Sequence, residues 1–451
     1  MSSEQCDVVI IGGGPGGSTA ATLLARGGRK VVLFEKDRFP RFHIGESLLP
    51  RNMELFEELG VVEKLERHGF VPKYGGEFTA GNGEGGFTFR FRNAICNRYH
   101  RTFQVVRSEF DKLLLDHSRE HGADVREEHT VRNVRIQPGN GVEVEVESAR
   151  GTATVRARML VDASGRDTFL ANKLKTKRPI DTLKKVAVFA HFRGGFRATG
   201  EDGGNTVLVR VAPGSWFWLI PLHEGRVSVG LVTDGVALRE RGGDDEGLFQ
   251  EWIAGSPVMR ARLKGSERIS QFYVTSDFSY RSRQIVGDHW VMVGDSAAFL
   301  DPIFSTGVFL AMDSASRVNR LIERAFEAND FSARMFESYR RKQQGHIDLY
   351  FGLIFAYYRP ELMDLFVHPA NPFNIQLAIN SLLAGNVDGG FRLWSRMYLF
   401  YGLMWLQKKF GIVPRIDYER IADPPKLYPE DCQPPANNPE AFKAAPRPAT
   451  T

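Results

Sequence analysis

Residues 7–17 read Asp-Val-Val-Ile-Ile-Gly-Gly-Gly-Pro-Gly-Gly, and this stretch decides the fold. The apolar, β-branched run at 7–11 predicts a strand that is buried on both faces. The glycine run leads into a helical segment at 18–26 and then into a second apolar run at 30–34. The segment therefore predicts a βαβ unit, and with it an α/β fold of the Rossmann type.

The glycine run also has the G-x-G-x-x-G spacing of a dinucleotide site. Glycines at this spacing allow a tight turn, a close approach of the backbone to a pyrophosphate and close packing of helix on strand. An acidic residue ends the second strand, where a carboxylate can accept a hydrogen bond from a ribose hydroxyl. The predicted contacts of the dinucleotide in this unit are Gly12, Gly14, Pro15, Gly17, Glu35 and Lys36.

Composition excludes several classes of function. The 451 residues are 42% hydrophobic and 25% charged, with a net charge of +5, which describes a globular chain with a large core. The basic residues are scattered, so we expect no nucleic-acid partner. The three cysteines (Cys6, Cys96 and Cys432) have neither metal-ligand nor disulfide spacing, which predicts no metal site and a cytoplasmic location. No signal peptide is expected.

One apolar segment, 397–406 (MYLFYGLMWL), raises the question of a membrane. It has about half the length of a membrane span and is flanked by basic residues. We expect a buried or pocket-lining helix and no membrane association, although contact with a membrane surface stays open as an alternative.

Residues 213–221 read Pro-Gly-Ser-Trp-Phe-Trp-Leu-Ile-Pro. The period of a strand places Trp216 and Trp218 on one face, and Pro221 ends the ladder because it has no backbone N–H. Core packing alone would explain two such side chains. With Ile220, however, the segment resembles the WxWxIP signature of the flavin-dependent halogenases at every fixed position. The resemblance implies that this segment forms a barrier between the substrate and the flavin.

A second motif agrees with this resemblance. Residues 299–307 (FLDPIFSTG) resemble the FxxPxxSxG motif of the same family. Consecutive backbone N–H groups in a turn of small residues can form an anion-binding concavity. The resemblance implies a halide site at Pro302, Ser305, Thr306 and Gly307. The alternative is a turn that only begins the helix expected at 308–317.

Lys73 follows a proline and precedes two glycines. A lysine in this setting is ordinarily a solvated charge. In the halogenases, however, the catalytic lysine has a similar local setting, so the resemblance implies that Lys73 is the catalytic residue.

Four further segments resemble the FAD-contacting parts of the group A flavoprotein monooxygenases and halogenases: 39–50, 104–115, 159–166 and 290–297. They favour FAD over NAD. The FAD contacts that they add are Glu46, Ser47, Arg107, Asp162, Gly165, Gly294 and Asp295, together with Gly307 from the halide motif. Two alternatives stay open: Ser47 could cap a helix beginning near Leu48, and Arg107 could be an ordinary charge at a helix N-terminus.

The predicted architecture is a Rossmann-type FAD-binding domain of the glutathione reductase and p-hydroxybenzoate hydroxylase type, with an antiparallel β-sheet layer on the substrate side and a C-terminal helical region. Residues 1–330 form the monooxygenase-like module. Its FAD-binding parts are expected at about 1–70, 100–180 and 280–330, and its substrate-side sheet at about 71–99 and 181–279. A helical substrate-site region at 331–422 and a proline-rich tail at 423–451 follow.

The resemblance also implies a reaction. Reduced FAD from a separate flavin reductase reacts with O₂ to give a C4a-hydroperoxide, which oxidises chloride or bromide to hypohalous acid. Lys73 then directs the halogen to an electron-rich aromatic ring, as in natural-product biosynthesis. The family's free-tryptophan enzymes have a glutamate where this chain has Phe304. A phenol or pyrrole, free or tethered to an acyl or peptidyl carrier protein, is therefore the expected substrate.

Two other functions are alternatives to a halogenase. The first is an aromatic hydroxylase or reductase of the same fold, which has no use for Lys73 together with the two tryptophans. The second is a flavin-bound carrier protein without turnover, which would yield only hydrogen peroxide.

Overall fold

The predicted βαβ unit is present in the computed structural model of the chain, which describes residues 4–422 except 96–97, 138, 277–278, 369–374 and 389. Its elements are β1 (Glu4–Ile11), α1 (Pro15–Arg26) and β2 (Val31–Phe34). The two strands are parallel, with Ile11 opposite Phe34. The predicted tail at 423–451, together with Cys96 and Cys432, lies outside the described residues.

This unit is the middle of the first sheet. The strand order is β19-β20-β10-β1-β2-β7, and the hairpin β8-β9 extends from β10. The four pairs from β20 to β7 are parallel, so their carboxyl ends meet at one edge, which is where this kind of sheet binds ligands. The further strands are β7 (Asp124–Arg126), β8 (Thr130–Gln137), β9 (Gly141–Ser148), β10 (Gly151–Asp162), β19 (Val286–Gly287) and β20 (Trp290–Met292).

The second sheet is the predicted substrate-side layer. Its order is β16-β12-β15-β14-β13-β4-β5, with β17 also paired to β12, and every pair is antiparallel except β13 with β4. Its strands are β4 (Gly75–Ala80), β5 (Gly86–Arg90), β12 (Lys185–Arg193), β13 (Thr206–Ala212), β14 (Ser215–Pro221), β15 (Arg226–Asp234), β16 (Glu267–Arg268) and β17 (Tyr273–Ser276). The fold class predicted from the sequence is confirmed.

Helices and short strands connect the two sheets. Gly60 has a left-handed backbone conformation (φ +79°) and ends the first of two short helices, α2 (Asn52–Leu59) and α3 (Val62–His68). The other connecting elements are β3 (Val71–Lys73), β6 (Thr102–Gln104), α4 (Arg107–Glu120), α5 (Phe169–Lys173), β11 (Lys177–Pro179), α6 (Gly235–Glu240), α7 (Asp245–Gly255), α8 (Pro257–Arg262), β18 (Tyr280–Ser282), β21 (Ala298–Phe299) and α9 (Gly307–Ala328).

The structure corrects the alternative proposed for Ser47. No helix begins near Leu48, because α2 starts only at Asn52. Ser47 instead forms an isolated β-bridge with Gln104, so it belongs to the short β3-β6 ribbon region and not to a helix cap.

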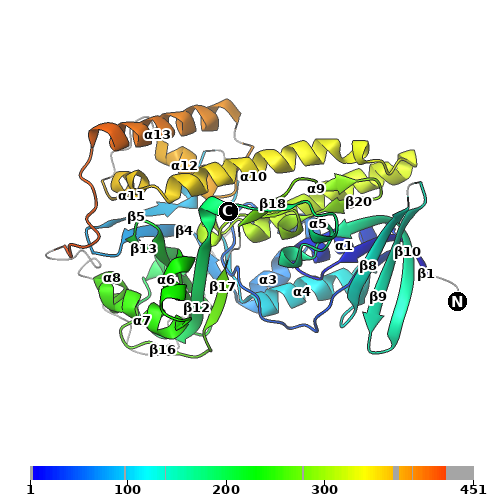
Figure 1. Cartoon of the computed structure of the whole chain (residues 1–451), viewed down its shortest axis with the longest axis horizontal. Coiled ribbons are helices and arrows are strands. Elements are labelled where there is room, and N and C mark those ends of the chain that lie inside the picture. Colours follow the sequence, from blue (N-terminus) through cyan, green and yellow to red (C-terminus); the bar gives the residue numbers. More distant parts are fainter. Residues whose placement is uncertain are drawn as a thin grey trace, which may run out of the picture.

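The C-terminal part is helical, as predicted, and lies along the top of the view in Figure 1. Its helices are α10 (Glu337–Tyr357), α11 (Pro360–Val367), α12 (Ile375–Leu383) and α13 (Gly390–Phe410). The core of α10 to α13 is continuous with that of the second sheet, because one cluster of buried side chains includes Phe78, Trp216, Tyr357 and Phe400. Whether residues 331–422 form a unit separate from residues 1–330 stays a prediction.

Helix α13 is only half buried, so the prediction of a buried or pocket-lining helix is wrong for its outer face. Met397, Phe400 and Met404 are buried, whereas Tyr398 and Trp405 are 71% and 54% exposed. The segment is apolar on all sides, so periodicity could not indicate which side its neighbours would cover. None of the described helices has the combination of length and apolarity that a membrane crossing requires.

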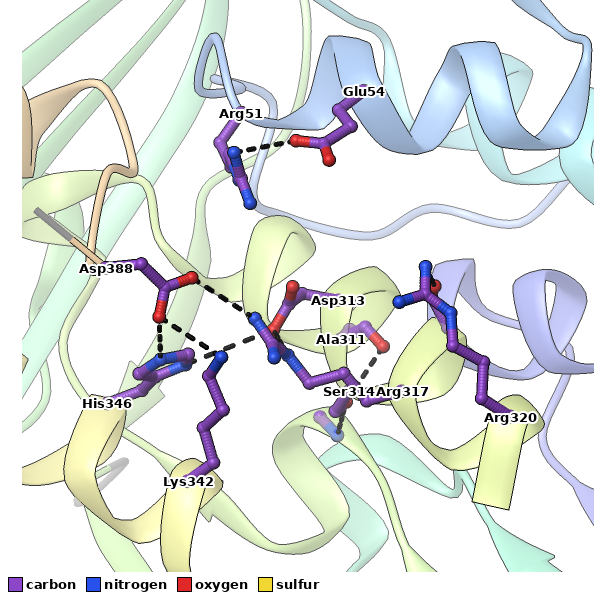
Figure 2. A network of polar contacts seen from close by, with 12 residues as sticks. Arg51, Glu54, Ala311, Asp313, Ser314, Arg317, Arg320, Lys342, His346 and Asp388 are labelled. Atoms are coloured by element: carbon purple, nitrogen blue, oxygen red, sulfur yellow. Dashed lines mark hydrogen bonds and ion pairs between the residues drawn. The ribbon is translucent and has the colours of Figure 1, made fainter. Parts of the chain in front are cut away.

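A charged cluster fastens the segment between α12 and α13 to the rest of the molecule. The Asp388 carboxylate lies 3.2–3.7 Å from nitrogen atoms of Arg317 on α9 and of Lys342 and His346 on α10. Figure 2 shows this cluster. The hydrogen bond from His346 and the neighbouring Lys342 and Arg317 hold the pKa of this carboxyl well below its usual range. Arg317 also pairs with Asp313 at 2.7 Å.

Candidate active site

A cavity of about 440 Å³ lies at the carboxyl edge of the first sheet, where the second sheet meets it. Most of the residues predicted to bind a cofactor line it: Gly12, Gly14, Pro15, Glu35, Lys36, Glu46, Ser47, Arg107, Gly165, Asp295 and Gly307. The predicted halide residues Pro302, Ser305 and Thr306 line it as well, as do Trp218 and Ile220. The structure thus brings together segments that are almost 300 residues apart.

The glycine loop is a cradle that a Cβ atom would fill. A Cβ at Gly12 would lie 2.4 Å from the Ala163 carbonyl oxygen, and one at Gly17 would lie 1.9 Å from the Gly12 carbonyl oxygen. At Gly14 the nearest atom would be the Arg41 guanidinium at 3.7 Å, so the backbone there is open to the cavity. The N–H groups of the first turn of α1 lie behind this loop, which suits a pyrophosphate.

Glu35 ends β2 beside this loop. Its Oε2 accepts a hydrogen bond from the Gly13 N–H (2.6 Å) and its Oε1 from the Asp37 N–H (2.9 Å). Burial raises the pKa of this carboxyl. The backbone therefore fixes a carboxylate at the cavity wall, as a ribose contact requires. Lys36, nearer the rim, pairs with Asp167.

Glu46 and Arg107 are held by other protein groups. Glu46 Oε1 lies 2.6 Å from His191 Nε2. Arg107, the first residue of α4, is buried; its guanidinium pairs with Asp111 and donates to the Ile44 carbonyl oxygen at 2.6 Å. Arg107 therefore fixes the backbone of the 44–45 segment where that segment borders the cavity.

Besides Lys73 and Pro221, four predicted site residues do not line the cavity: Gly17, Asp162, Gly294 and Trp216. Both carboxylate oxygens of Asp162 are occupied, since they accept from the N–H groups of Ser164 (2.9 Å) and Leu170 (2.8 Å). Asp162 therefore shapes the loop after β10. Asp295 does reach the cavity, and burial raises the pKa of its carboxyl to about 6. Pro221, the last residue of β14, also lies away from the cavity.

The predicted halide motif forms a tight turn. A 3-10 helix (Pro302–Phe304) is followed by Ser305 in the left-handed region (φ +56°), by Thr306 in the right-handed region, and then by α9. Successive residues of opposite handedness turn their N–H groups toward one point, which makes an anion-binding concavity. The N-terminus of the 22-residue helix α9 adds favourable electrostatics for an anion.

The two tryptophans share one face of β14, as predicted. Their ring centroids are 6.0 Å apart, and both belong to the core cluster that excludes the intervening Phe217. Trp218 borders the cavity and lies flat over Gly230, where an added Cβ would come within 2.1 Å of the indole. Trp216 stands behind it and donates from Nε1 to the Tyr358 hydroxyl at 3.2 Å.

Lys73 is buried at the end of β3. Its Nζ donates to Ser47 Oγ (2.8 Å) and to the Leu48 carbonyl oxygen (3.0 Å), and it lies 5.4 Å from the Phe91 ring centroid. Both hydrogen-bond acceptors are neutral, and burial lowers the pKa of this amine to about 7. Lys73 does not line the cavity, but Ser47 does. One hydroxyl therefore separates the amine from the cavity.

Sequence reasoning did not find three residues of this region, Asp301, Tyr358 and Arg210. Tyr358 donates to Asp301 Oδ2 at 2.9 Å, although 57 positions separate the two residues. The guanidinium of Arg210, which is 1% exposed, donates to the carbonyl oxygens of Tyr357 and Tyr358 at the end of α10. The Asp-Pro pair at 301–302 was the only local signal, because aspartate before proline is typical of a turn.

Comparisons with known proteins agree with this geometry. A family model described as an FAD binding domain matches residues 5–343. The 1H-pyrrole-2-carbonyl-(peptidyl-carrier protein) chlorinase of Pseudomonas fluorescens is 34% identical over 415 residues, covering 87% of this chain and 92% of that protein.

Among solved structures, a flavoprotein/dehydrogenase from Cytophaga hutchinsonii has a TM-score of 0.81 at 29% identity and covers 90% of this chain and 99% of its own. The flavin-dependent brominase Bmp2 has a TM-score of 0.80 at 28% identity, with 90% of this chain and all of its own chain covered.

Proposed function

Since the chain belongs to the flavin-dependent halogenases, we propose that it halogenates a pyrrolic or phenolic ring delivered on a peptidyl or acyl carrier protein. It is an FAD-dependent enzyme that halogenates an aromatic ring; the class of ring and the carrier are the proposal. The observation that carries the proposal is the buried amine of Lys73, joined by the Ser47 hydroxyl to the cavity whose wall includes Trp218.

Different residues of the chain have different roles in the proposed reaction. Bound FAD supplies, with O₂, the oxidation of the halide. The concave turn at 305–307 is suited to hold the halide beside it, and Trp218 and Ile220 keep the substrate ring away from the flavin. Lys73 receives the oxidised halogen and directs it to the ring. Its burial excludes water, which protects a reactive oxidant from hydrolysis.

The substrate class is inferred from Phe304. This side chain is buried, and its ring makes an edge-to-face contact with Tyr357 at 5.9 Å between centroids. It stands where the free-tryptophan enzymes of the family have an assisting glutamate, so the ring itself must be electron-rich. The Pseudomonas relative, by its name, acts on a pyrrole held by a peptidyl carrier protein, which supports a tethered substrate for this chain too.

The hydroxylase alternative has no support, because the Pseudomonas relative, which covers 87% of this chain, is a chlorinase. We further propose that a separate flavin reductase supplies reduced FAD, and that the protein works in the cytoplasm. The second proposal rests on the cysteine pattern. Chloride and bromide remain equal candidates, since the relatives include a chlorinase and a brominase.

The test is a halogenation assay with FAD, a flavin reductase, NADH and either bromide or chloride. Pyrrole-2-carbonyl on a carrier protein is compared with free pyrrole-2-carboxylate and free phenols, and products are read by mass spectrometry. We expect a halogen isotope pattern on the carrier-bound substrate. Halogenation of the free compounds alone would contradict the carrier, and an oxygen adduct would contradict the halogenase.

The same assay tests Lys73. Lys73→Met keeps the volume of the side chain but removes the amine, and should lower halogenation on the order of 10²–10⁴-fold while flavin reoxidation continues. Lys64→Ala, a change at a partly exposed lysine on α3, is the control and should leave both rates unchanged. Undiminished halogenation by Lys73→Met would remove Lys73 from the reaction.

A further inference from the structure

A chain of hydrogen bonds joins the halide turn to the tryptophan wall, which consists of Trp216 and Trp218. The Trp216 Nε1–H donates to the Tyr358 hydroxyl at 3.2 Å, and that hydroxyl donates to Asp301 Oδ2 at 2.9 Å. The second oxygen of Asp301 accepts from the Ile303 N–H at 3.0 Å. The chain thus connects β14, the C-terminus of α10 and the turn that contains Ser305.

The direction of this chain is fixed at both ends. An indole N–H and a backbone N–H can only donate. The Tyr358 hydroxyl therefore accepts from Trp216 and donates to Asp301, which must accept at both of its oxygens. Only the ionised carboxylate satisfies every group. If Asp301 were protonated, two hydrogens would face each other between it and Tyr358, and one of them would lose its acceptor.

The backbone that carries Tyr358 is held independently. Arg210 Nη1 donates to the carbonyl oxygens of Tyr357 (2.7 Å) and Arg359 (3.1 Å), and Nη2 donates to that of Tyr358 (3.3 Å). These carbonyl groups end α10, where the helix dipole favours a cation. The backbone at Tyr358 is therefore held in place between the halide turn and the tryptophan wall.

We propose that Asp301 and Tyr358 are positioning residues that hold Trp216 in a fixed place relative to the halide turn, so that the tryptophan wall is intact only while Asp301 is ionised. The inference rests on the proposed function of this site. Trp216 touches Trp218 and so supports the indole that borders the cavity. When Asp301 is protonated, the Tyr358 hydroxyl is no longer held in one orientation, so Trp216 is held less firmly and the wall loosens. The oxidant then escapes, and more of the flavin is reoxidised without halogenated product.

The groups around Asp301 set the pH at which this happens. Tyr358 and the Ile303 N–H contact it directly, and the Lys185 ammonium of β12 lies 4.7 Å from the Tyr358 ring centroid. Burial raises the pKa of Asp301 to about 6, although these three groups favour the ionised form. The chain is therefore complete at pH 7 to 8 and breaks as the pH falls below about 6. Asp301 also borders the cavity, so its protonation removes a negative charge close to the halide turn.

Three variants test the proposal. Tyr358→Phe removes only the hydroxyl, and Asp301→Asn places a donor where the chain requires an acceptor. Tyr357→Phe is the matched control. Its hydroxyl is buried and next in sequence, but it has no hydrogen-bond partner among the residues that the structure describes. The first measurement is the ratio of halogenated product to flavin reoxidised. At pH 7.5 it should fall about tenfold in Tyr358→Phe and Asp301→Asn and less than twofold in Tyr357→Phe.

The second measurement needs no turnover. Bromide is titrated calorimetrically into FAD-loaded protein between pH 5 and 8. In the wild type bromide should bind more tightly as Asp301 is protonated, while the product ratio falls over the same pH range. Both pH dependences should be absent from Asp301→Asn. A merely structural role would lower the melting temperature without moving either profile, so melting curves and FAD affinity are recorded for each variant.

Equal product ratios for Tyr358→Phe and Tyr357→Phe would overturn the role of Tyr358. A wild-type pH profile of bromide binding in Asp301→Asn would overturn that of Asp301. If the wild type itself yields only peroxide, the proposed substrate fails, whereas the bromide titration still decides whether Asp301 acts on the halide turn.

Discussion

The two walls of the active-site cavity are built in different ways. The wall that faces the predicted FAD consists mainly of backbone: the glycine loop, the end of β2 and the turn after β20. The other side, called the lysine side, depends on side chains from distant segments: Lys73 donates to Ser47, and Trp216 is linked through Tyr358 to Asp301. A cofactor common to many proteins is bound by local motifs, whereas the chemistry specific to this family depends on tertiary packing. Changes in one wall should therefore leave the other intact.

The largest effect is expected at Arg210, on the lysine side. Arg210→Met leaves three carbonyl groups at the end of α10 without their donor, which should lower the free energy of unfolding by about 3 kcal/mol. Guanidinium unfolding measures this loss. The control Arg320→Met, at a side chain that is 67% exposed, should change stability by about 0.5 kcal/mol or less. FAD affinity should stay within about twofold of the wild type, and a larger loss would show that the two walls are coupled.

The reverse test is Gly17→Ala on the cofactor side. The added Cβ would collide with the Gly12 carbonyl oxygen, so the loop must shift at a cost of about 2 kcal/mol and FAD affinity should fall about thirtyfold. Binding is followed by the quenching of flavin fluorescence. Gly255→Ala is the control, because nothing lies within 4 Å of its Cβ position. Halogenation should return at saturating FAD; a persistent loss would mean that the change has reached Lys73.

The lysine side should also show a pH dependence of stability, which arises from Lys73. Burial lowers the pKa of Lys73 to about 7, whereas an unfolded lysine titrates near about 10.4. Between these values the unfolded chain binds a proton that the folded chain does not. Lys73 therefore makes the free energy of unfolding rise with pH by up to about 1.4 kcal/mol per unit, and the effect levels off below about pH 7.

Lys73→Met removes this dependence while all other groups stay the same. The variant should be more stable than the wild type at pH 7, and its advantage should shrink steadily toward pH 9.5 in urea unfolding. A difference that does not change with pH would mean that the amine is charged in the folded protein.

The smallest effect is expected outside both walls, at Asp388. This carboxylate is partly exposed, so Asp388→Asn should cost only about 0.5 kcal/mol at pH 7, and less in 1 M salt. Because its pKa is lowered, the contribution exists above about pH 4 and disappears as the pH falls below it. Thermal melts at two salt concentrations measure it. A loss of FAD affinity in this variant would contradict the independence of the C-terminal helices from the cofactor wall.

The difference between the walls also explains what the sequence could predict. The glycine loop, Glu35 and the turn at 302–307 are each defined by short stretches of sequence. Spacing located the first two, and the resemblance to a family motif located the turn. The contacts of Lys73 with Ser47 and of Asp301 with Tyr358 span 26 and 57 positions. They depend on how the second sheet and α10 pack against the first sheet, and no local sequence pattern contains that information. The same limit applies to α13, whose outer face only the packing could identify.

The glycine beneath Trp218 also bears on how such a wall can change over evolutionary time. Gly230 on β15 and Trp218 on β14 form a cross-strand pair matched in size: β14 can carry the largest side chain at 218 only because β15 carries none at 230. A single substitution at 230 would force the indole to move. A lineage could reshape this part of the pocket only by changing both positions together, with a smaller ring at 218 admitting a side chain at 230. Engineered variants that aim at a wider passage would have to introduce the two changes as one step.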